Sequence, residues 1–254
     1  MPNHCSNTFY FTGNEDDIAE LKKRVIVYRN PDDEDYTGEA IAFDFNGIVP
    51  MPESLNVSTC STSACYALTL LKLPPDLLLT SSKVFRHLDH ILQQLKQQEI
   101  DTANLTVARF IQHLRDNPEL QDNCQFDLQL GQQYYDNIQN HGSKDWYDWS
   151  VANWGTKWNA YACVIEQDEP TILSGCFETA WSPPEPVFRA IAQQFPNVDI
   201  TARYLELGMY FAGSYYSDGE DGLFEEAEET DAIEDFAVEF FGYVFKPDDE
   251  NGTS

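Results

Sequence analysis

Strand patterns at both ends of the chain flank a long middle with helical patterns, and this order limits the possible folds more than any other feature. Residues 7–11 are aromatic and β-prone, which predicts a first strand. Residues 14–25 combine an asparagine cap, an acidic first turn and apolar residues at helical spacing, so they predict a helix. Residues 40–45 alternate and predict a second strand. The first part of the chain therefore has the order strand, helix, strand.

The last third of the chain repeats this order with an extra strand on each side. Residues 158–165 and 171–177 predict a hairpin, and the two prolines at 183–184 are typical of a helix start. Residues 198–207 and 209–216 predict a second hairpin. Taken together, the two ends predict an α+β fold with a split β-α-β sandwich.

The middle of the chain is predicted to be a helical insertion. Apolar residues recur at helical spacing within residues 84–95, 105–114 and 128–138. The alternative is a separate three-helix domain beside a small sheet domain, and the two interpretations differ in whether the insertion has its own core. The predicted segments are a first β-α-β half (1–57), the helical insertion (58–144), a second half (145–217) and an acidic aromatic C-terminal extension (218–254).

The net charge restricts which partners suit the chain. Its 254 residues include 15 Lys and Arg against 43 Asp and Glu, which gives −28 at pH 7. Such a chain repels nucleic acid and anionic membranes, so an electrostatic partner should be basic. An apolar share of 42% is typical of a folded globular protein. We find no pattern of a signal peptide or membrane span and expect a cytoplasmic location.

The sequence contains no recognisable pattern for catalysis, metal binding or a cofactor. The six cysteines include no Cys-x-x-Cys pair. His4 and Cys5 are adjacent on a predicted strand, where neighbouring side chains point to opposite faces. His87 and His90 are one helical turn apart, but no carboxylate–histidine signature accompanies them. We therefore expect a non-enzymatic protein with no metal and no cofactor.

Several motifs resemble a known family. They are Met1–Asn7, Phe45-x-x-Ile48-Val49-Pro50-Met51-Pro52, Trp154–Ala160, Phe177–Pro184, and Tyr204-x-Glu206-x-Gly208 leading into Phe211-Ala212-Gly213. In these motifs the chain resembles the YubB-type ferredoxin-like family, a set of plasmid, prophage and phage accessory proteins of unassigned biochemical role. The resemblance implies a ferredoxin-like topology and a bacterial cytoplasm. Residues 58–144 and the C-terminal extension match it least.

A tryptophan-rich stretch and its downstream partner form the first candidate site. Lys157 lies between two tryptophans in a chain with few cations, and Glu178 begins the partner segment. One interpretation is a ligand pocket. The other is a structural clamp in which Lys157 and Glu178 form an ion pair and the indoles pack over the lysine stem. The candidate residues are Trp154, Lys157, Trp158, Glu178 and Trp181.

The C-terminal extension forms the second candidate site and holds nearly half of the net charge. From Asp218 onward, fourteen acidic residues stand against one cation, Lys246. Many large apolar residues are interleaved with them, which is not typical of a disordered acidic run. We expect residues 225–245 to be ordered, partly as a helix and then as an aromatic strand. The candidate partner-binding residues are Asp218, Glu220, Asp221, Glu225, Glu226, Glu228, Glu229, Asp231, Glu234 and Asp235.

An ordered acidic surface has a specific use, because it can occupy the basic cleft with which another protein binds nucleic acid. Our leading hypothesis is a non-enzymatic inhibitor that mimics nucleic acid and blocks a host defence protein, of restriction or CRISPR type, or another DNA-binding protein. The alternative is a small-ligand-binding or catalytic module with its pocket at Trp154–Ala160. A third hypothesis is a structural subunit that self-associates through the aromatic end strand.

Overall fold

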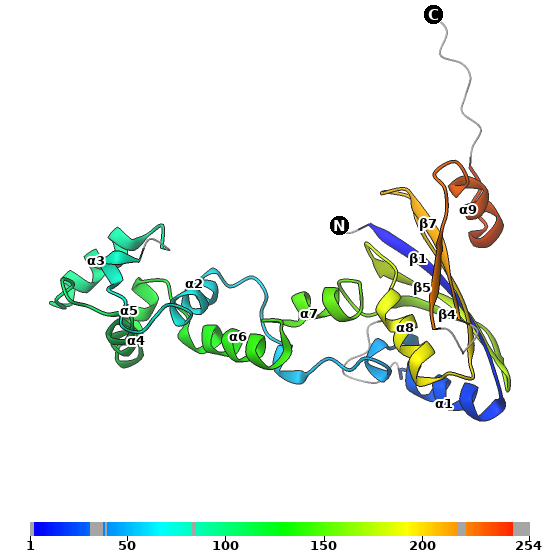
Figure 1. Ribbon diagram of the computed structural model, residues 1–254, viewed down its shortest axis with the longest axis horizontal. Helices are drawn as coiled ribbons and strands as arrows, with labels where there is room; N and C mark the ends of the chain where they lie inside the picture. The colour runs from blue at the N-terminus through cyan, green and yellow to red at the C-terminus, as the bar shows by residue number, and fades with distance from the viewer. Residues whose placement is uncertain (1–2, 31–37, 39, 83–84, 218–221, 246–254) are drawn as a thin grey trace, which may run out of the picture. The chain divides into compact units, whose positions relative to one another are not determined.

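The computed structural model describes residues 3–30, 38, 40–82, 85–217 and 222–245. It divides into two compact units. Figure 1 shows their helices and strands, coloured by residue number from blue at the N-terminus to red at the C-terminus. The sheet unit comprises residues 1–50 and 150–254, and the helical unit comprises residues 51–149. The chain therefore leaves the sheet unit once, builds the helical unit, and returns.

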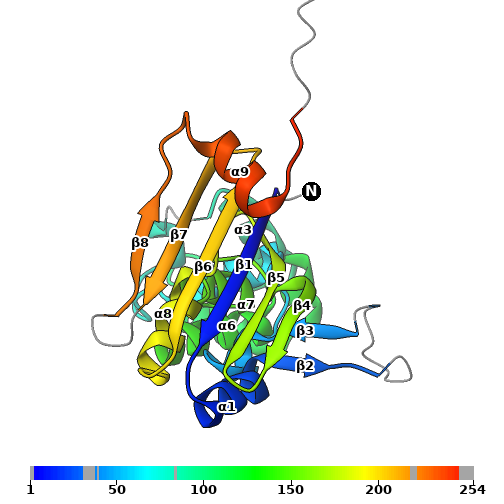
Figure 2. The same ribbon diagram turned by 90° about the vertical axis from the view of Figure 1, so that its right-hand side faces the viewer.

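A six-stranded antiparallel sheet forms the centre of the sheet unit, in the order β4-β5-β1-β6-β7-β8 (Figure 2). Both neighbours of β1 pair with it antiparallel, so β5 and β6 run parallel to each other on either side of it. One helix, α8, connects β5 to β6. The strands are β1 (His4–Thr12), β4 (Tyr161–Glu169), β5 (Ile172–Ala180), β6 (Asp199–Glu206), β7 (Phe211–Ser217) and β8 (Phe224–Ala227).

One face of this sheet, here called the α8 face, carries the aromatic core. Phe9 and Phe11 of β1 and Phe177 of β5 are buried on it, and their rings contact one another or Phe43. Phe188 of α8 (Glu185–Gln194) packs against Phe11 and Phe177. Burial alternates along β1, and the first strand predicted from the aromatic residues 7–11 is confirmed.

The helix α1 (Glu15–Val25) follows β1 and has the local signals that the sequence predicts. Asn14 caps it by accepting a hydrogen bond from the backbone N–H of Asp17 at 2.9 Å. Its apolar stripe, which includes Leu21, is buried. Acidic residues lie in the first turn and basic residues in the last, which suits the helix dipole.

The strand predicted at residues 40–45 exists but does not join the large sheet, so the predicted first β-α-β half is wrong in this respect. The strand β3 (Ile41–Phe43) pairs antiparallel with β2 (Ile26–Tyr28) in a separate two-stranded sheet. The reason is local, because β2 follows α1 directly and offers its free edge to β3. A short 3-10 helix (Phe45–Gly47) then ends this part of the unit.

The second face of the large sheet, here called the α9 face, is covered by the C-terminal helix α9 (Ile233–Phe241). Figure 1 shows α8 and α9 on opposite sides of the sheet. Ile233, Phe236 and Ala237 pack against Leu205 and Ala212 of the sheet. The predicted order of this segment, a helix and then an aromatic strand, is wrong. The strand β8 comes first because it pairs with β7, and α9 follows because its apolar stripe covers the sheet.

The described residues between 62 and 141 form five helices of the helical unit, and the three predicted apolar stripes correspond to α3, α4 and α6. These helices surround a core that includes Leu95, Phe110 and Leu114. Gly131 allows α2 and α6 to approach, because a Cβ atom there would lie 2.4 Å from the Cβ of Ala67. The unit thus has its own core. The helices are α2 (Thr62–Leu71), α3 (Leu88–Gln97), α4 (Val107–Asp116), α5 (Pro118–Asn123) and α6 (Leu128–His141).

The chain returns from the helical unit to the sheet unit within the short helix α7 (Trp146–Asn153). Two 3-10 turns (Glu53–Leu55 and Leu79–Ser81) complete the helical unit. Among the described residues, no helix is both long and apolar enough to cross a bilayer.

Candidate functional site

The first residue of the tryptophan-rich stretch, Trp154, is part of the core. Its side chain is buried, its Nε1 donates a hydrogen bond to the Val49 carbonyl at 2.9 Å, and its ring meets Phe45 edge to face at 5.7 Å. These contacts join the two chain segments that build the sheet unit. Trp154 therefore acts as a structural anchor.

The residues that follow Trp154 continue this anchoring. Thr156 donates a hydrogen bond from Oγ1 to the Ala180 carbonyl at 2.8 Å and accepts one from the Ala180 N–H at 3.1 Å. Asn159 donates to Asp44 at 2.6 Å and accepts from the backbone N–H of Phe45 at 2.9 Å. The stretch from Trp154 to Ala160 thus connects the end of β5 with the segment after β3.

Lys157 lies against two indole rings. Its Nζ atom is 4.3 Å from the ring centroid of Trp158 and 5.1 Å from that of Trp181. Trp181 is 39% exposed and has a backbone φ of 74°, which is uncommon for a residue other than glycine. These are cation–π contacts at the edge of the sheet unit.

Glu178 has different partners, so the predicted ion pair with Lys157 is absent among the ion pairs of the described residues. Ser6 Oγ donates to Glu178 Oε1 at 3.2 Å, and His4 Nδ1 lies 3.6 Å from Oε2. The reason is register, since Ser6 pairs with Glu178 across adjacent strands. Lys157 belongs to the turn before β4 instead.

The neighbours of Glu178 extend this polar cluster across three strands. Tyr161 Oη lies 2.7 Å from His4 Nδ1, and Tyr161 is paired in register with Glu178. Burial, and then the negative charge of Glu178, raise the pKa of Tyr161 to about 12. Cys5 points to the other face and is buried, as the strand alternation predicts, and burial raises the pKa of its thiol to about 12. The phenol and the thiol therefore stay protonated at neutral pH.

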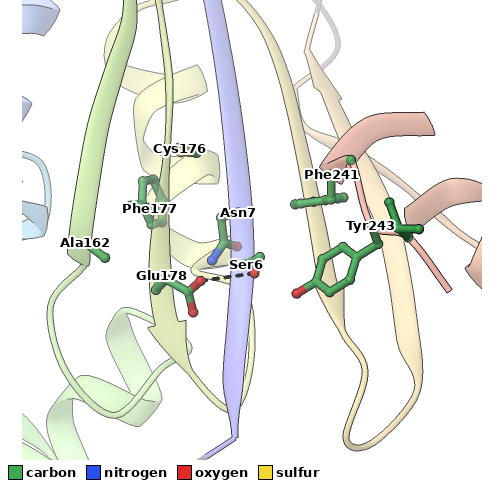
Figure 3. A pocket seen from close by; sticks show the side chains of 10 residues that line it. Ser6, Asn7, Ala162, Cys176, Phe177, Glu178, Phe241 and Tyr243 are labelled. Carbon is green, nitrogen blue, oxygen red and sulfur yellow. Dashed lines mark hydrogen bonds between the residues drawn. The ribbon is translucent and has the colours of Figure 1, made fainter. Parts of the chain in front are cut away.

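A pocket of about 510 Å³ lies beside Glu178 on the α9 face of the sheet, and Figure 3 shows its lining. One wall comes from the strands and contributes Ser6, Cys176 and Glu178. The other wall comes from the end of α9 and the residues after it, and contributes Phe241 and Tyr243. Sequence analysis identified Glu178 but did not connect it with these two aromatic residues.

A second pocket of about 600 Å³ lies on the same face and contains a basic residue that sequence analysis missed. It is lined by Arg203 of β6, Phe240 of α9 and Glu166 of β4, among others. The guanidinium carbon of Arg203 lies 4.2 Å from the ring centroid of Phe240. The alternation along β6 places Arg203 on the α9 face, and this alternation is the sequence signal that could have identified the residue.

The described acidic candidates lie on β8, in the loop after it and in the first turn of α9. Glu225 and Glu226 are exposed on β8, and as neighbours on a strand they point to opposite faces. Glu225 accepts a hydrogen bond from Tyr204 Oη at 2.7 Å. Glu229, Asp231, Glu234 and Asp235 are exposed and Glu228 is half-buried. The remaining candidates, Asp218, Glu220 and Asp221, lie outside the described residues.

The histidine and cysteine side chains do not assemble a metal centre within the described part of the chain. No group of three or more His, Cys, Asp or Glu residues there has the geometry to hold a metal ion. The ring of His87 lies tilted against that of Tyr66 in the helical unit, with the centroids 4.4 Å apart, while His90 Nε2 lies 2.9 Å from the carbonyl of Asn123. These two histidines therefore have separate surroundings.

Comparison with known proteins gives one family match and one structural match. Residues 157–241 match a family model described as the ferredoxin-like domain in Api92-like protein. The crystal structure of protein api92 from Yersinia pseudotuberculosis covers 90% of this chain over 99% of its own, at 12% identity and a TM-score of 0.41. No curated protein matches the chain. The matched residues run from the tryptophan-rich stretch through β8 and α9, so the match includes the described acidic residues of these two elements.

Proposed function

We propose that the protein is a non-enzymatic, acidic binding protein that occupies the basic cleft of a nucleic-acid-binding partner in place of nucleic acid. The observation that best supports this proposal is the unequal charge of the two units. The sheet unit contains 31 acidic and 8 basic residues, a net charge of −23. The helical unit contains 12 acidic and 7 basic residues, a net charge of −5.

A folded surface of this charge resembles nucleic acid in the property that basic clefts recognise. Duplex DNA carries about one charge per 1.7 Å of its axis, and its protein partners meet it with lysines and arginines. A rigid acidic surface forms the same ion contacts and attracts a basic partner over roughly a Debye length, about 8 Å at physiological ionic strength.

The strand β8 and the helix α9 are the elements that we propose to meet the partner. Residues 222–245 contain eight acidic residues and no lysine or arginine. β8 is an edge strand, so its carboxylates are held on a regular backbone rather than on a loose tail. Ordered carboxylates lose less conformational entropy on binding than those of a flexible tail.

The test compares two variants that each lose four charges. One replaces Glu226, Glu229, Asp235 and Glu239 of the β8–α9 segment with Gln or Asn. The control makes the same change at four exposed acids of the helical unit, Asp89, Glu99, Asp116 and Glu119. Both variants and the unchanged protein are used to capture partners from bacterial lysate, and captured proteins are tested for DNA binding.

We expect the unchanged protein and the helical-unit control to retain a DNA-binding partner that duplex DNA displaces, and the β8–α9 variant to lose it. Restriction and CRISPR-type defence proteins are the partner class to test first. Binding should weaken steeply between 50 and 200 mM salt. A partner that binds equally well in high salt, or that DNA does not displace, contradicts the proposal.

We also propose the finer fold and family assignment. The position of β1 between β5 and β6, with α8 as the connection, supports a split β-α-β arrangement for the ferredoxin-like domain. The motifs given above support a relation to the YubB-type family. The alternative function, a ligand pocket at Trp154–Ala160, has weaker support because Trp154 and Thr156 use their polar groups on the backbone of the same unit.

A further inference from the structure

We infer that the pocket beside Glu178 binds an organic cation, an ammonium or guanidinium group on an aliphatic chain. The inference deepens the proposed function, on which its biological role rests, because a basic partner would supply such a group as a lysine or arginine side chain. The pocket also accommodates a free amine, and the experiment below separates the two sources.

The carboxylate of Glu178 is held in place but only partly neutralised. Ser6 Oγ donates to one oxygen at 3.2 Å, and His4 Nδ1 lies 3.6 Å from the other. The side chain of Glu178 is 32% exposed, and no lysine or arginine is among the described residues that line the pocket. A fixed, accessible carboxylate that has no lysine or arginine beside it among these described residues is a strong acceptor for a charged donor.

The opposite wall presents aromatic rings. Figure 3 shows the rings of Phe241 and Tyr243 directed toward the strands that carry Ser6 and Glu178. Tyr243 is 41% exposed and stacks on Phe245 at 6.3 Å. A cation between a carboxylate and an aromatic face gains both an ion pair and a cation–π contact.

The chain itself supplies a model for this arrangement in the neighbouring pocket. There Glu166, the ring of Phe240 and the guanidinium of Arg203 line one cavity, and Arg203 lies over the ring at 4.2 Å. The pocket beside Glu178 has the same two components, a carboxylate and aromatic rings from the end of α9. The difference is that the described lining of the pocket beside Glu178 includes no arginine or lysine.

The surrounding field favours the same class of ligand. The sheet unit carries a net charge of −23, so it concentrates cations near its surface and repels anions. The field alone is not selective, however. The test must therefore separate a local effect of Glu178 from the general charge of the unit.

The experiment uses the full chain and three matched probes, the blocked amino acids N-acetyl-lysine methylamide, N-acetyl-arginine methylamide and N-acetyl-norleucine methylamide. Binding is followed by calorimetry and by amide NMR shifts at pH 7.5 and constant ionic strength. We expect the two cationic probes to bind, with shifts at Ser6, Glu178 and Tyr243. The norleucine probe, which has a similar chain and no charge, should bind at least roughly tenfold more weakly.

The variant Glu178→Gln keeps the shape of the side chain and can still accept a hydrogen bond from Ser6. We expect it to weaken the binding of the cationic probes at least roughly tenfold. The control Asp199→Asn removes one exposed charge of the same unit, outside the pocket and outside the β8–α9 segment, and should change affinity less than about twofold. Tyr243→Leu tests the aromatic wall and should weaken binding several-fold. Equal losses in Glu178→Gln and Asp199→Asn, or equal binding of the norleucine probe, would overturn the inference.

Two further probes identify the source of the cation and separate this inference from the proposed function. A short lysine-containing peptide that binds much more tightly than spermidine indicates a protein partner, and the reverse indicates a free amine. Both results support the pocket. If partner capture depends on the β8–α9 acids while Glu178→Gln has no effect on the probes, the proposed function stands and the pocket fails. If the probes bind through Glu178 but no partner is captured, the pocket stands and the proposed function fails.

Discussion

The guanidinium of Arg203 lies over the ring of Phe240, 4.2 Å from its centroid, and so connects the central strand β6 with the last turn of α9. The contact joins one of the few cations of the sheet unit to the C-terminal segment that carries many of its acids. Together with the apolar contacts of Phe236, it holds α9 against the sheet.

Replacing Phe240 with Leu should loosen α9. The change removes the cation–π contact and the ring contact with Phe236, and we expect a loss of about 1 kcal/mol in the free energy of unfolding. Urea denaturation gives this value, and hydrogen exchange should show lower protection in α9. Val238→Ala, at a position that is 51% exposed, is the control and should have little effect. Similar losses in both variants would show that the contact contributes nothing specific.

Replacing Trp154 with Phe should destabilise the sheet unit. The variant keeps an aromatic ring but leaves the Val49 carbonyl without its donor, for a cost of about 1–3 kcal/mol. Trp181→Phe is the matched control, because Trp181 is 39% exposed and its replacement keeps a ring over Lys157. In chemical denaturation, Trp154→Phe should lose more free energy of unfolding than Trp181→Phe. A larger loss for Trp181 would mean that the exposed indole, not the buried one, anchors the stretch.

The cysteines should differ in reactivity according to burial. Cys60 is exposed, whereas Cys5 and Cys124 are buried, and burial raises the pKa of their thiols to about 12 and about 11. At pH 8 a disulfide reagent should modify Cys60 rapidly in the native protein and reach Cys5 and Cys124 only after unfolding. Cys60→Ser should remove the fast phase, and a fast phase that persists in this variant would disprove the assignment.

The stability of the helical unit should fall in mild acid because of His87. Burial lowers the pKa of His87 in the folded protein below its value of about 6.5 in the unfolded chain. Between these two pKa values the unfolded chain binds more protons than the folded protein. The contribution of His87 to stability is therefore fully present above about pH 6.5 and is lost as the pH falls toward the folded pKa.

This prediction is measured by urea unfolding of the full chain between pH 7.5 and 5, with a probe in the helical unit. His87→Phe should reduce the pH dependence, whereas His90→Gln, on the exposed side of α3, should leave it in place. An unchanged pH profile in His87→Phe would assign the effect to other groups.

Much of the fold follows from local sequence. The cap at Asn14, the paired prolines before α8 and the alternation in β1 and the first part of β6 each act within a few residues, where backbone sterics and hydrogen bonding decide the structure. The three apolar stripes of the helical unit are equally local, and all three became helices.

The candidate site was only half predictable. Lys157 and Glu178 were predicted to pair with each other, but register places Glu178 beside Ser6, and the turn before β4 places Lys157 against two indoles. The order of β8 and α9 was reversed for a similar reason. The first segment forms a strand because it pairs with β7, and the second forms a helix that covers Leu205. Neither β7 nor Leu205 can be identified as a partner from the local pattern.

The sequence by itself determined the acidic character of the protein, the type of most elements and the helical middle, because composition and short-range periodicity carry that information. Only the tertiary structure decided that most of the charge belongs to one unit, that α9 covers one face of the sheet, and that Tyr243 lines the same pocket as Glu178, which lies 65 positions earlier in the chain. Those features depend on strand register and packing between distant segments, and the free energy of such contacts is not written in any single stretch of the chain.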